Sequence, residues 1–97
     1  MALTIDYSNV KKAASVLRAL NHKLRQQMLE LIDRENKITV TDIFIRLRLE
    51  QSVASGHLRI LRHAGVVTTQ RDGKHIYYSI NYQRLEKVND IAHDLIT

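Results

Sequence analysis

The sequence predicts a mainly α domain with one β-hairpin. Apolar residues recur every three or four positions over residues 51–63, the spacing of a helix that buries one side. Two β-rich runs around Asp72-Gly73 follow directly, and an Asp-Gly pair between such runs is a strong hairpin signal. A shorter helical segment at residues 42–47 precedes the 51–63 helix and is separated from it only by a tight turn. Together these features predict a winged helix-turn-helix as a single domain of residues 1–97.

The first part of the chain predicts a loosely ordered start followed by a helix. Residues 1–7 are mixed in character and carry no clear period. Ser8 or Asn9 can cap a helix that runs to Leu20, because short polar side chains accept hydrogen bonds from the first free N–H groups. We therefore expect the first helix to begin near residue 9.

The next segment predicts a second helix, a short β run and a third helix. Apolar residues at helical spacing over 24–32 are followed by a polar stretch and then by the β-branched residues 38–40. Thr39 or Thr41 can cap the third helix, predicted over 42–47, and Asp42 stands three residues after Thr39 as in a capping box. This third helix leads into the helix of residues 51–63.

The outward face of the 51–63 helix is polar at its start and basic further along, which is typical of a DNA-recognition helix. Short amide and hydroxyl groups can contact base edges, and cations can contact phosphates. The hairpin tip is basic as well. We predict DNA contacts from five residues of the helix and three of the hairpin tip: Gln51, Ser52, Ser55, Gly56, Arg59, Arg71, Lys74 and His75.

Each of these contacts has a structural alternative that the sequence leaves open. A polar residue at the helix start can simply cap the helix, and the basic side chains can simply be solvated. Gly56 is unfavourable within a helix, so we expect it where the backbone approaches DNA closely. His57 lies beside the apolar face and is expected to pack rather than to contact DNA.

Residues 81–97 predict a final helix that joins two copies of the chain. Its apolar residues fall at steps of three or four, and the first helix has a similar stripe. Both stripes are wider than a domain of this size can cover by itself. We predict a homodimer whose contact is made by the first and last helices through Val10, Leu17, Leu85, Val88, Ile91 and Leu95.

The distribution of charge favours a polyanionic partner. The net charge is +5, and residues 46–75 hold six Lys/Arg against two Asp/Glu. Residues 81–97 hold two Lys/Arg against three Asp/Glu, so the positive charge gathers around the predicted recognition helix and hairpin. Charge alone would also suit a merely basic soluble protein.

Composition excludes several other classes of function. The chain has no Cys, so disulfides, thiolate metal sites and thiol switches are excluded. It has no glycine-rich phosphate loop or nucleophile-elbow motif, and we expect no enzymatic activity and no cofactor. With no apolar run near the ~20 residues of a membrane span and no secretory pattern, we expect a cytoplasmic protein with no membrane contact.

Several local motifs resemble the ArsR/SmtB-type winged-helix repressors of bacteria, over roughly residues 10–97. Residues 51–58 resemble the family's recognition-helix motif Ser-Gln-Ser-x-Val-Ser-x-His-Leu, and residues 61–67 match its Leu-Arg-x-Ala-Gly-Leu-Val exit. Residues 20–32 resemble the opening of its second helix, although a lysine stands where proline is usual, and residues 71–80 match its wing. The resemblance implies a repressor that binds DNA.

The metal sites of this family have no counterpart here. Where its metal sensors carry Cys-x-Cys at the third helix, this chain has Thr39 and Thr41, which are not soft ligands. His93 is one residue away from a ligand position of the last helix, so it would point about 100° aside. Other residues stand at the ligand positions of that helix: Asn81, Gln83, Asp94 and Thr97. We expect no metal.

The sequence therefore predicts a sequence-specific, DNA-binding transcriptional regulator. A homodimeric repressor that binds an imperfect palindrome is favoured, because helix-turn-helix proteins usually pair recognition helices across a two-fold axis. The alternative is a winged-helix protein-interaction module with secondary, nonspecific DNA binding. Control by the protein's own abundance, by a capturing partner or by a small ligand at the dimer interface stays open.

Overall fold

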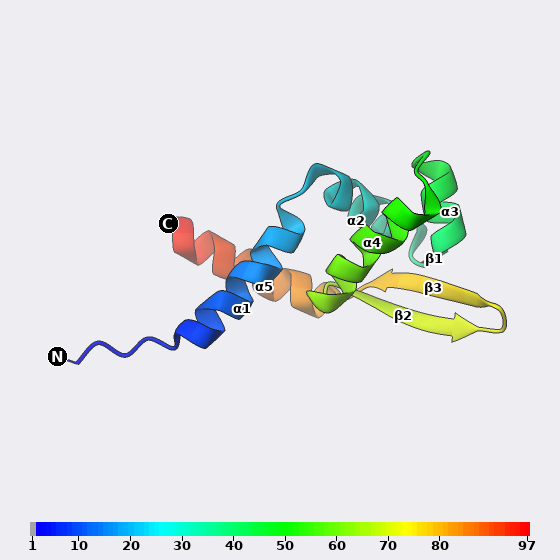
Figure 1. The fold of residues 1–97 in the computed structure, drawn as a ribbon. Helices are drawn as coiled ribbons and strands as arrows, with labels where there is room; N and C mark the ends of the chain where they lie inside the picture. Colours follow the sequence, from blue (N-terminus) through cyan, green and yellow to red (C-terminus); the bar gives the residue numbers. More distant parts are fainter. Residues whose placement is uncertain (1) are drawn as a thin grey trace.

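The computed structural model describes residues 2–97 and has the predicted winged helix-turn-helix architecture. Figure 1 shows the helix-turn-helix and hairpin at one end and two helices extending from the other. In chain order the elements are α1 (Tyr7–Leu20), α2 (Lys23–Glu35), β1 (Ile38–Thr39), α3 (Val40–Arg46), α4 (Gln51–His63), β2 (Val67–Asp72), β3 (His75–Ile80) and α5 (Tyr82–Ile96). Within residues 2–97, no helix is long and apolar enough to cross a membrane.

The first helix begins earlier than predicted. Asp6 is its N-cap, and the Asp6 carboxylate accepts a hydrogen bond from the backbone N–H of Asn9 at 3.2 Å. The expectation that Ser8 or Asn9 caps this helix was therefore wrong. Residues 2–6 have no regular structure and are exposed, whereas Met1 lies outside the described residues.

Thr39 caps α3; it is one of the two residues, Thr39 and Thr41, that the sequence offered for this role. Its hydroxyl accepts a hydrogen bond from the N–H of Asp42 at 3.2 Å, so the helix already begins at Val40 rather than at Asp42. The β run is correspondingly shorter than predicted and consists of Ile38 and Thr39 alone.

A tight turn joins α3 to α4. Arg48 adopts a left-handed backbone with φ of 56°, which reverses the chain direction within a few residues. The N–H of Leu49 donates to the carbonyl oxygen of Phe44 at 2.8 Å and closes the turn. This turn fixes α4 against α3.

The hairpin is part of a three-stranded antiparallel sheet in the order β1-β3-β2. Asp72 pairs with His75, so the turn residues are Gly73 and Lys74, one position beyond the predicted Asp-Gly pair. Gly73 has φ of 63°, a conformation that glycine adopts at little cost at the first position of such a turn. At the other end Ile38 of β1 pairs with Tyr78 of β3 and ties the base of the hairpin to the helix-turn-helix.

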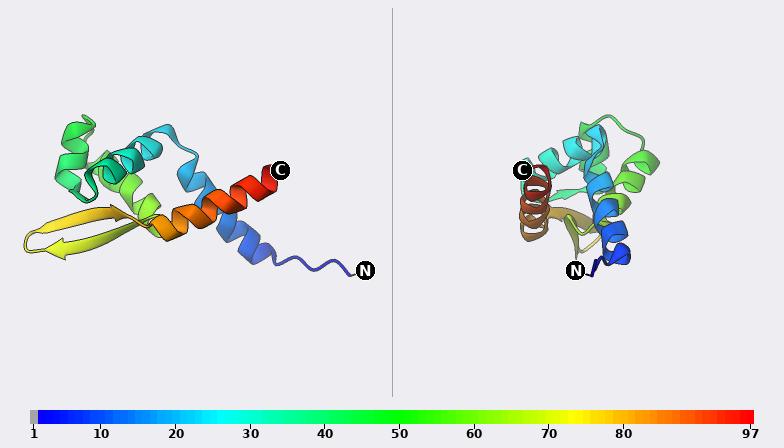
Figure 2. Two further views of the ribbon diagram at one scale, coloured as in Figure 1. Left: turned by 180° about the vertical axis from the view of Figure 1, so that it is seen from behind. Right: turned by 90° about the vertical axis from the view of Figure 1, so that its left-hand side faces the viewer.

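The core lies beneath α4, and α1 and α5 contribute little to it. The largest fully buried side chains come from α2, α3, α4 and the start of the wing: Met28, Leu31, Ile32, Ile43, Leu58, Leu61 and Val66. In α1 only Ala19 is buried, and α5 has no buried residue. Figure 2 shows both helices at the end of the molecule opposite the wing. Their apolar stripes are therefore left largely uncovered by this chain.

Candidate nucleic-acid interface

The recognition helix α4 presents its polar side to solvent. It buries Ala54, Leu58 and Leu61, and the opposite side carries Ser52 and Arg59, both exposed. Side chains seven residues apart lie close to one line along a helix, so these two groups belong to the same face. Ser55 and Gly56 lie between them and are half-buried, and Gln51 is exposed at the helix start.

The polar residues at the start of α4 are not used to cap it. Glu50 is the N-cap residue, and no side chain accepts a hydrogen bond from the first turn. The side chains of Gln51 and Ser52 are therefore free to meet another molecule. Capping was the alternative role for these residues, and this structure does not support it.

Gly56 has no structural reason within the chain to be glycine. A Cβ built on it would meet nothing within 4 Å, and its φ is not in the left-handed region. Glycine inside a helix costs about 1 kcal/mol relative to alanine. A close approach of the α4 backbone to a partner remains the explanation that we predict.

His57 packs against the rest of the chain, as predicted. Its side chain contacts Arg25 of α2. The guanidinium Nη1 of Arg25 lies 3.2 Å from Nδ1 of His57, and the His22 ring lies 4.8 Å away between centroids. Burial, then the nearby His22 and Arg25, lower the pKa of His57 below its ordinary value. Arg25 also donates to the carbonyl oxygens of Ala19 and Arg18, at 2.7 and 3.2 Å.

Sequence reasoning did not identify Arg25 as a residue that supports the site. The pattern of residues 20–25 indicates only a likeness to a family motif. The structure shows what this segment does: it ties the end of α1 and the start of α2 to the recognition helix.

The three predicted wing residues form a second group, apart from α4. Arg71, Lys74 and His75 are all exposed at the hairpin tip, which extends away from the helices in Figure 1. The Arg71 Nε donates to the carbonyl oxygen of Gly73 at 3.3 Å, which orients this side chain along the turn. The candidate site therefore consists of the polar face of α4 and a separate basic tip of the wing.

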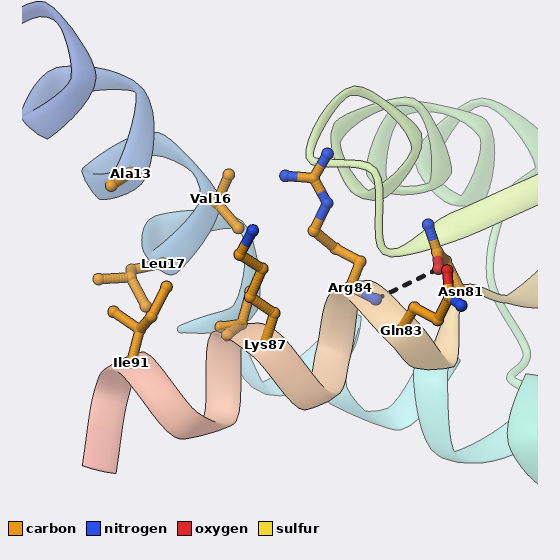
Figure 3. A pocket seen from close by; sticks show the side chains of 9 residues that line it. Ala13, Val16, Leu17, Asn81, Gln83, Arg84, Lys87 and Ile91 are labelled. Carbon is orange, nitrogen blue, oxygen red and sulfur yellow. Dashed lines mark hydrogen bonds between the residues drawn. The ribbon is translucent and has the colours of Figure 1, made fainter. Parts of the chain in front are cut away.

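The predicted dimer residues divide into an exposed and a half-buried set. Val10, Ile91 and Leu95 are 55%, 46% and 71% exposed, whereas Leu17 and Val88 are half-buried. Figure 3 shows Leu17 and Ile91 side by side in the groove of about 400 Å³ between α1 and α5. Exposed apolar residues in such a cluster mark an interaction surface.

Leu85 differs from the other members of this set, because it packs partly against the core of its own chain. Four more exposed apolar residues were not predicted: Leu3 and Ile5 precede α1, and Tyr7 and Ile96 are the first residue of α1 and the last residue of α5. Their exposure enlarges the uncovered apolar surface.

No metal-binding group is found where the structure describes the chain. Across residues 2–97, no three His, Asp or Glu side chains come together as metal ligands would. His93, the residue nearest to a family ligand position, is exposed near the end of α5.

This fold and this site define a winged helix-turn-helix regulator that binds DNA. The arsR family of bacterial regulatory proteins matches residues 22–69. The chain is 30% identical to the transcriptional activator HlyU of Vibrio cholerae over 87 residues, 90% of this chain and 80% of HlyU. It is 32% identical to the transcriptional repressor PagR of Bacillus anthracis over 84 residues, 87% of this chain and 84% of PagR. The chain belongs to the arsR family.

Solved structures show the same fold. The crystal structure of PagR aligns with a TM-score of 0.71 at 30% identity and covers 90% of this chain and 99% of that one. The homodimeric winged helix-turn-helix DNA-binding domain of Mb0332 from Mycobacterium bovis aligns with a TM-score of 0.78 at 24% identity, over 98% of this chain and 90% of that one. The predicted family and fold are confirmed, and the alternative of a protein-interaction module is not favoured.

Proposed function

We propose that the chain is a homodimeric transcriptional repressor that binds an imperfect palindrome in double-stranded DNA. The observation that carries this proposal is the arrangement of α4. Its apolar side is buried in the core. The polar residues at its start, which do not cap the helix, and Arg59 face solvent. A helix held in this way can enter a major groove with its N-terminal side chains toward the bases.

The proposed roles divide between base reading and phosphate contact. Gln51, Ser52 and Ser55 read base edges, and Gly56 allows the backbone to come close. Arg59 contacts a phosphate beside the groove. The exposed wing tip of Arg71, Lys74 and His75 contacts the backbone or the minor groove of the flanking DNA.

The uncovered faces of α1 and α5 supply the dimer contact. A second copy of the chain would bury the exposed apolar residues of both helices around a two-fold axis. Two recognition helices would then meet half-sites about one helical turn apart, roughly 34–36 Å. Relatives named as repressor and as activator are both known, and repression is proposed here from the likeness to PagR.

The family and the relatives are regulators, and we infer that this chain has no catalytic activity of its own and acts without a cofactor. Because its target would be chromosomal DNA, we place it in the cytoplasm.

Selection of bound duplexes from a random pool, followed by footprinting, tests the proposal. We expect a palindromic consensus with two protected half-sites, and binding that weakens steeply with added salt because phosphate contacts release counterions. Weak binding without a consensus, together with a stoichiometric protein partner, would instead support the interaction module.

A further inference from the structure

A second groove lies between α1 and α4, on a different face of α1 from the groove in Figure 3. It has a volume of about 510 Å³ and is closed at one side by the start of α5. The charged side chains that line it are all cationic, namely Lys12, Arg59 and Arg84, and the imidazole of His63 lies beside them. None of its lining residues is acidic.

These cations have no carboxylate partner among the described residues. Across residues 2–97 the one ion pair joins Arg46 to Glu35 at 2.9 Å, away from the groove. The remaining lining is largely apolar and includes Val16 of α1 and Ile60 of α4. Uncompensated positive charge above an apolar surface suits a ligand with an anionic group on an apolar body.

The side chain of Arg84 lies against Gly65, which follows α4. A Cβ on Gly65 would lie 3.1 Å from Nη2 and 3.2 Å from Cζ of Arg84, so the guanidinium lies against a residue that has no side chain. The φ of 78° at Gly65 also requires glycine. Asn81 donates to the carbonyl oxygen of Gly65 at 2.9 Å and accepts from the N–H of Arg84 at 3.2 Å.

Figure 3 shows the Arg84 side chain extending from α5 toward the end of α4. Its charged group is thus brought to the end of α4, beside the groove.

The groove adjoins the proposed dimer face, because Val16 and Arg84 line both this groove and the one in Figure 3. Lys12 is two residues from Val10 and therefore about 160° away from it around α1. Dimerisation through Val10 and its neighbours would therefore leave the Lys12 side of the groove open to solvent.

We propose that this groove binds a small organic anion, whose phosphate or carboxylate group contacts Lys12, Arg59 and Arg84 while its apolar body lies on Val16 and Ile60. The volume is within the ~300–1,000 Å³ range of small-ligand pockets. The consequence for regulation rests on the proposed function. Arg59 lies on the DNA-facing side of α4 as well, so an anion bound to it competes with a DNA phosphate.

Titration of the free protein by NMR tests the site, with phenyl phosphate and phenylacetate as probes and phenol as the neutral control. We expect saturable shifts of the Ala64 and Gly65 amides with at least one anionic probe, at millimolar affinity, and none with phenol. Lys12→Glu should abolish these shifts. Lys11→Glu is the matched control, because Lys11 is also exposed on α1 but does not line the groove, and it should retain them.

Absence of saturable shifts with both anionic probes would overturn the proposal, as would equal binding by the two lysine variants. Suppose that no probe bound and that Lys12→Glu also weakened binding to every DNA sequence more than Lys11→Glu did. The groove would then be a surface that contacts the DNA backbone. The titration contains no DNA, so a negative result does not bear on the proposed function. Equally, a failure to bind DNA would not change the result of the titration.

A second measurement tests the regulatory consequence. The probe that binds should lower the DNA affinity of the wild-type chain severalfold at constant ionic strength. The Lys12→Glu variant should bind DNA with the same affinity in the presence and in the absence of this probe. An equal effect on both proteins would show that the probe acts outside the groove.

Discussion

Arg25 holds His57 of the recognition helix, with 3.2 Å between the guanidinium Nη1 and the imidazole Nδ1. A guanidinium can only donate, so Nδ1 must accept and cannot carry a proton. Since Arg25 also donates to the end of α1 through the carbonyl oxygen of Ala19, one side chain positions α4 relative to two other helices. This arrangement requires a neutral His57.

Acid should therefore weaken the fold through His57. Its pKa is lowered from 6.5 by burial and by the nearby His22 and Arg25, so the unfolded chain binds more protons below that pH. The stability that a neutral His57 contributes is complete above pH 6.5 and is lost as the pH falls toward the folded-state pKa. Urea unfolding from pH 7.5 to 5.5 measures this, and His57→Gln should show a shallower decline than wild type.

His75→Gln is the control for this experiment, because His75 is exposed at the wing tip. It should follow the wild-type pH dependence. An unchanged pH dependence in His57→Gln would contradict the role given to the Arg25–His57 contact.

Replacing Gly56 should separate stability from DNA binding. Gly56→Ala adds a methyl group where nothing lies within 4 Å, so we expect the free energy of unfolding to rise by about 1 kcal/mol. If the α4 backbone approaches DNA here, the same methyl group should lower DNA affinity severalfold. Urea unfolding and fluorescence anisotropy with labelled duplex measure the two effects, and a stabilised variant with wild-type affinity would contradict this use of Gly56.

The dimer face can be tested at Ile91, which is 46% exposed in the single chain. Ile91→Asp would place a charge in the contact at two symmetric places, a cost of several kcal/mol. We expect folded monomers in sedimentation and circular dichroism. His93→Asp places an acidic group at an exposed position of α5 that does not line the groove between α1 and α5, and it should remain dimeric.

Leu85→Asp should behave differently, because Leu85 packs partly on the core. We expect it to lower the stability of the domain as well as to disrupt dimers. An Ile91→Asp protein that is folded and still dimeric would show that the contact lies elsewhere.

The recognition helix and the wing could be predicted from sequence because their signals are local. The apolar spacing over residues 51–63 and the β-rich runs beside Gly73 each specify one element without help from the rest of the chain. The start of α1 could not be chosen in this way. Asp6, Ser8 and Asn9 are nearly equal as caps, so local propensity does not decide among them.

The contacts that position the site could not be predicted, because they join distant segments. The short β run was predicted, but its pairing with the hairpin was not, because a strand as short as β1 does not specify its partner. The pairing of Ile38 with Tyr78 makes this run the third strand of the sheet. Arg25 and His57 are 32 residues apart, and nothing in either segment alone specifies that they meet.

In the proposed complex α4 reads the base sequence while the wing contacts the DNA backbone. Anisotropy titrations of the selected palindrome and of a scrambled duplex, with Gln51→Ala and Lys74→Ala, test this division of roles. Gln51→Ala should cost about 1–3 kcal/mol on the palindrome and little on scrambled DNA. Lys74→Ala should weaken both about equally and reduce the salt slope by about 1. Equal losses on both duplexes for Gln51→Ala would contradict base reading by α4.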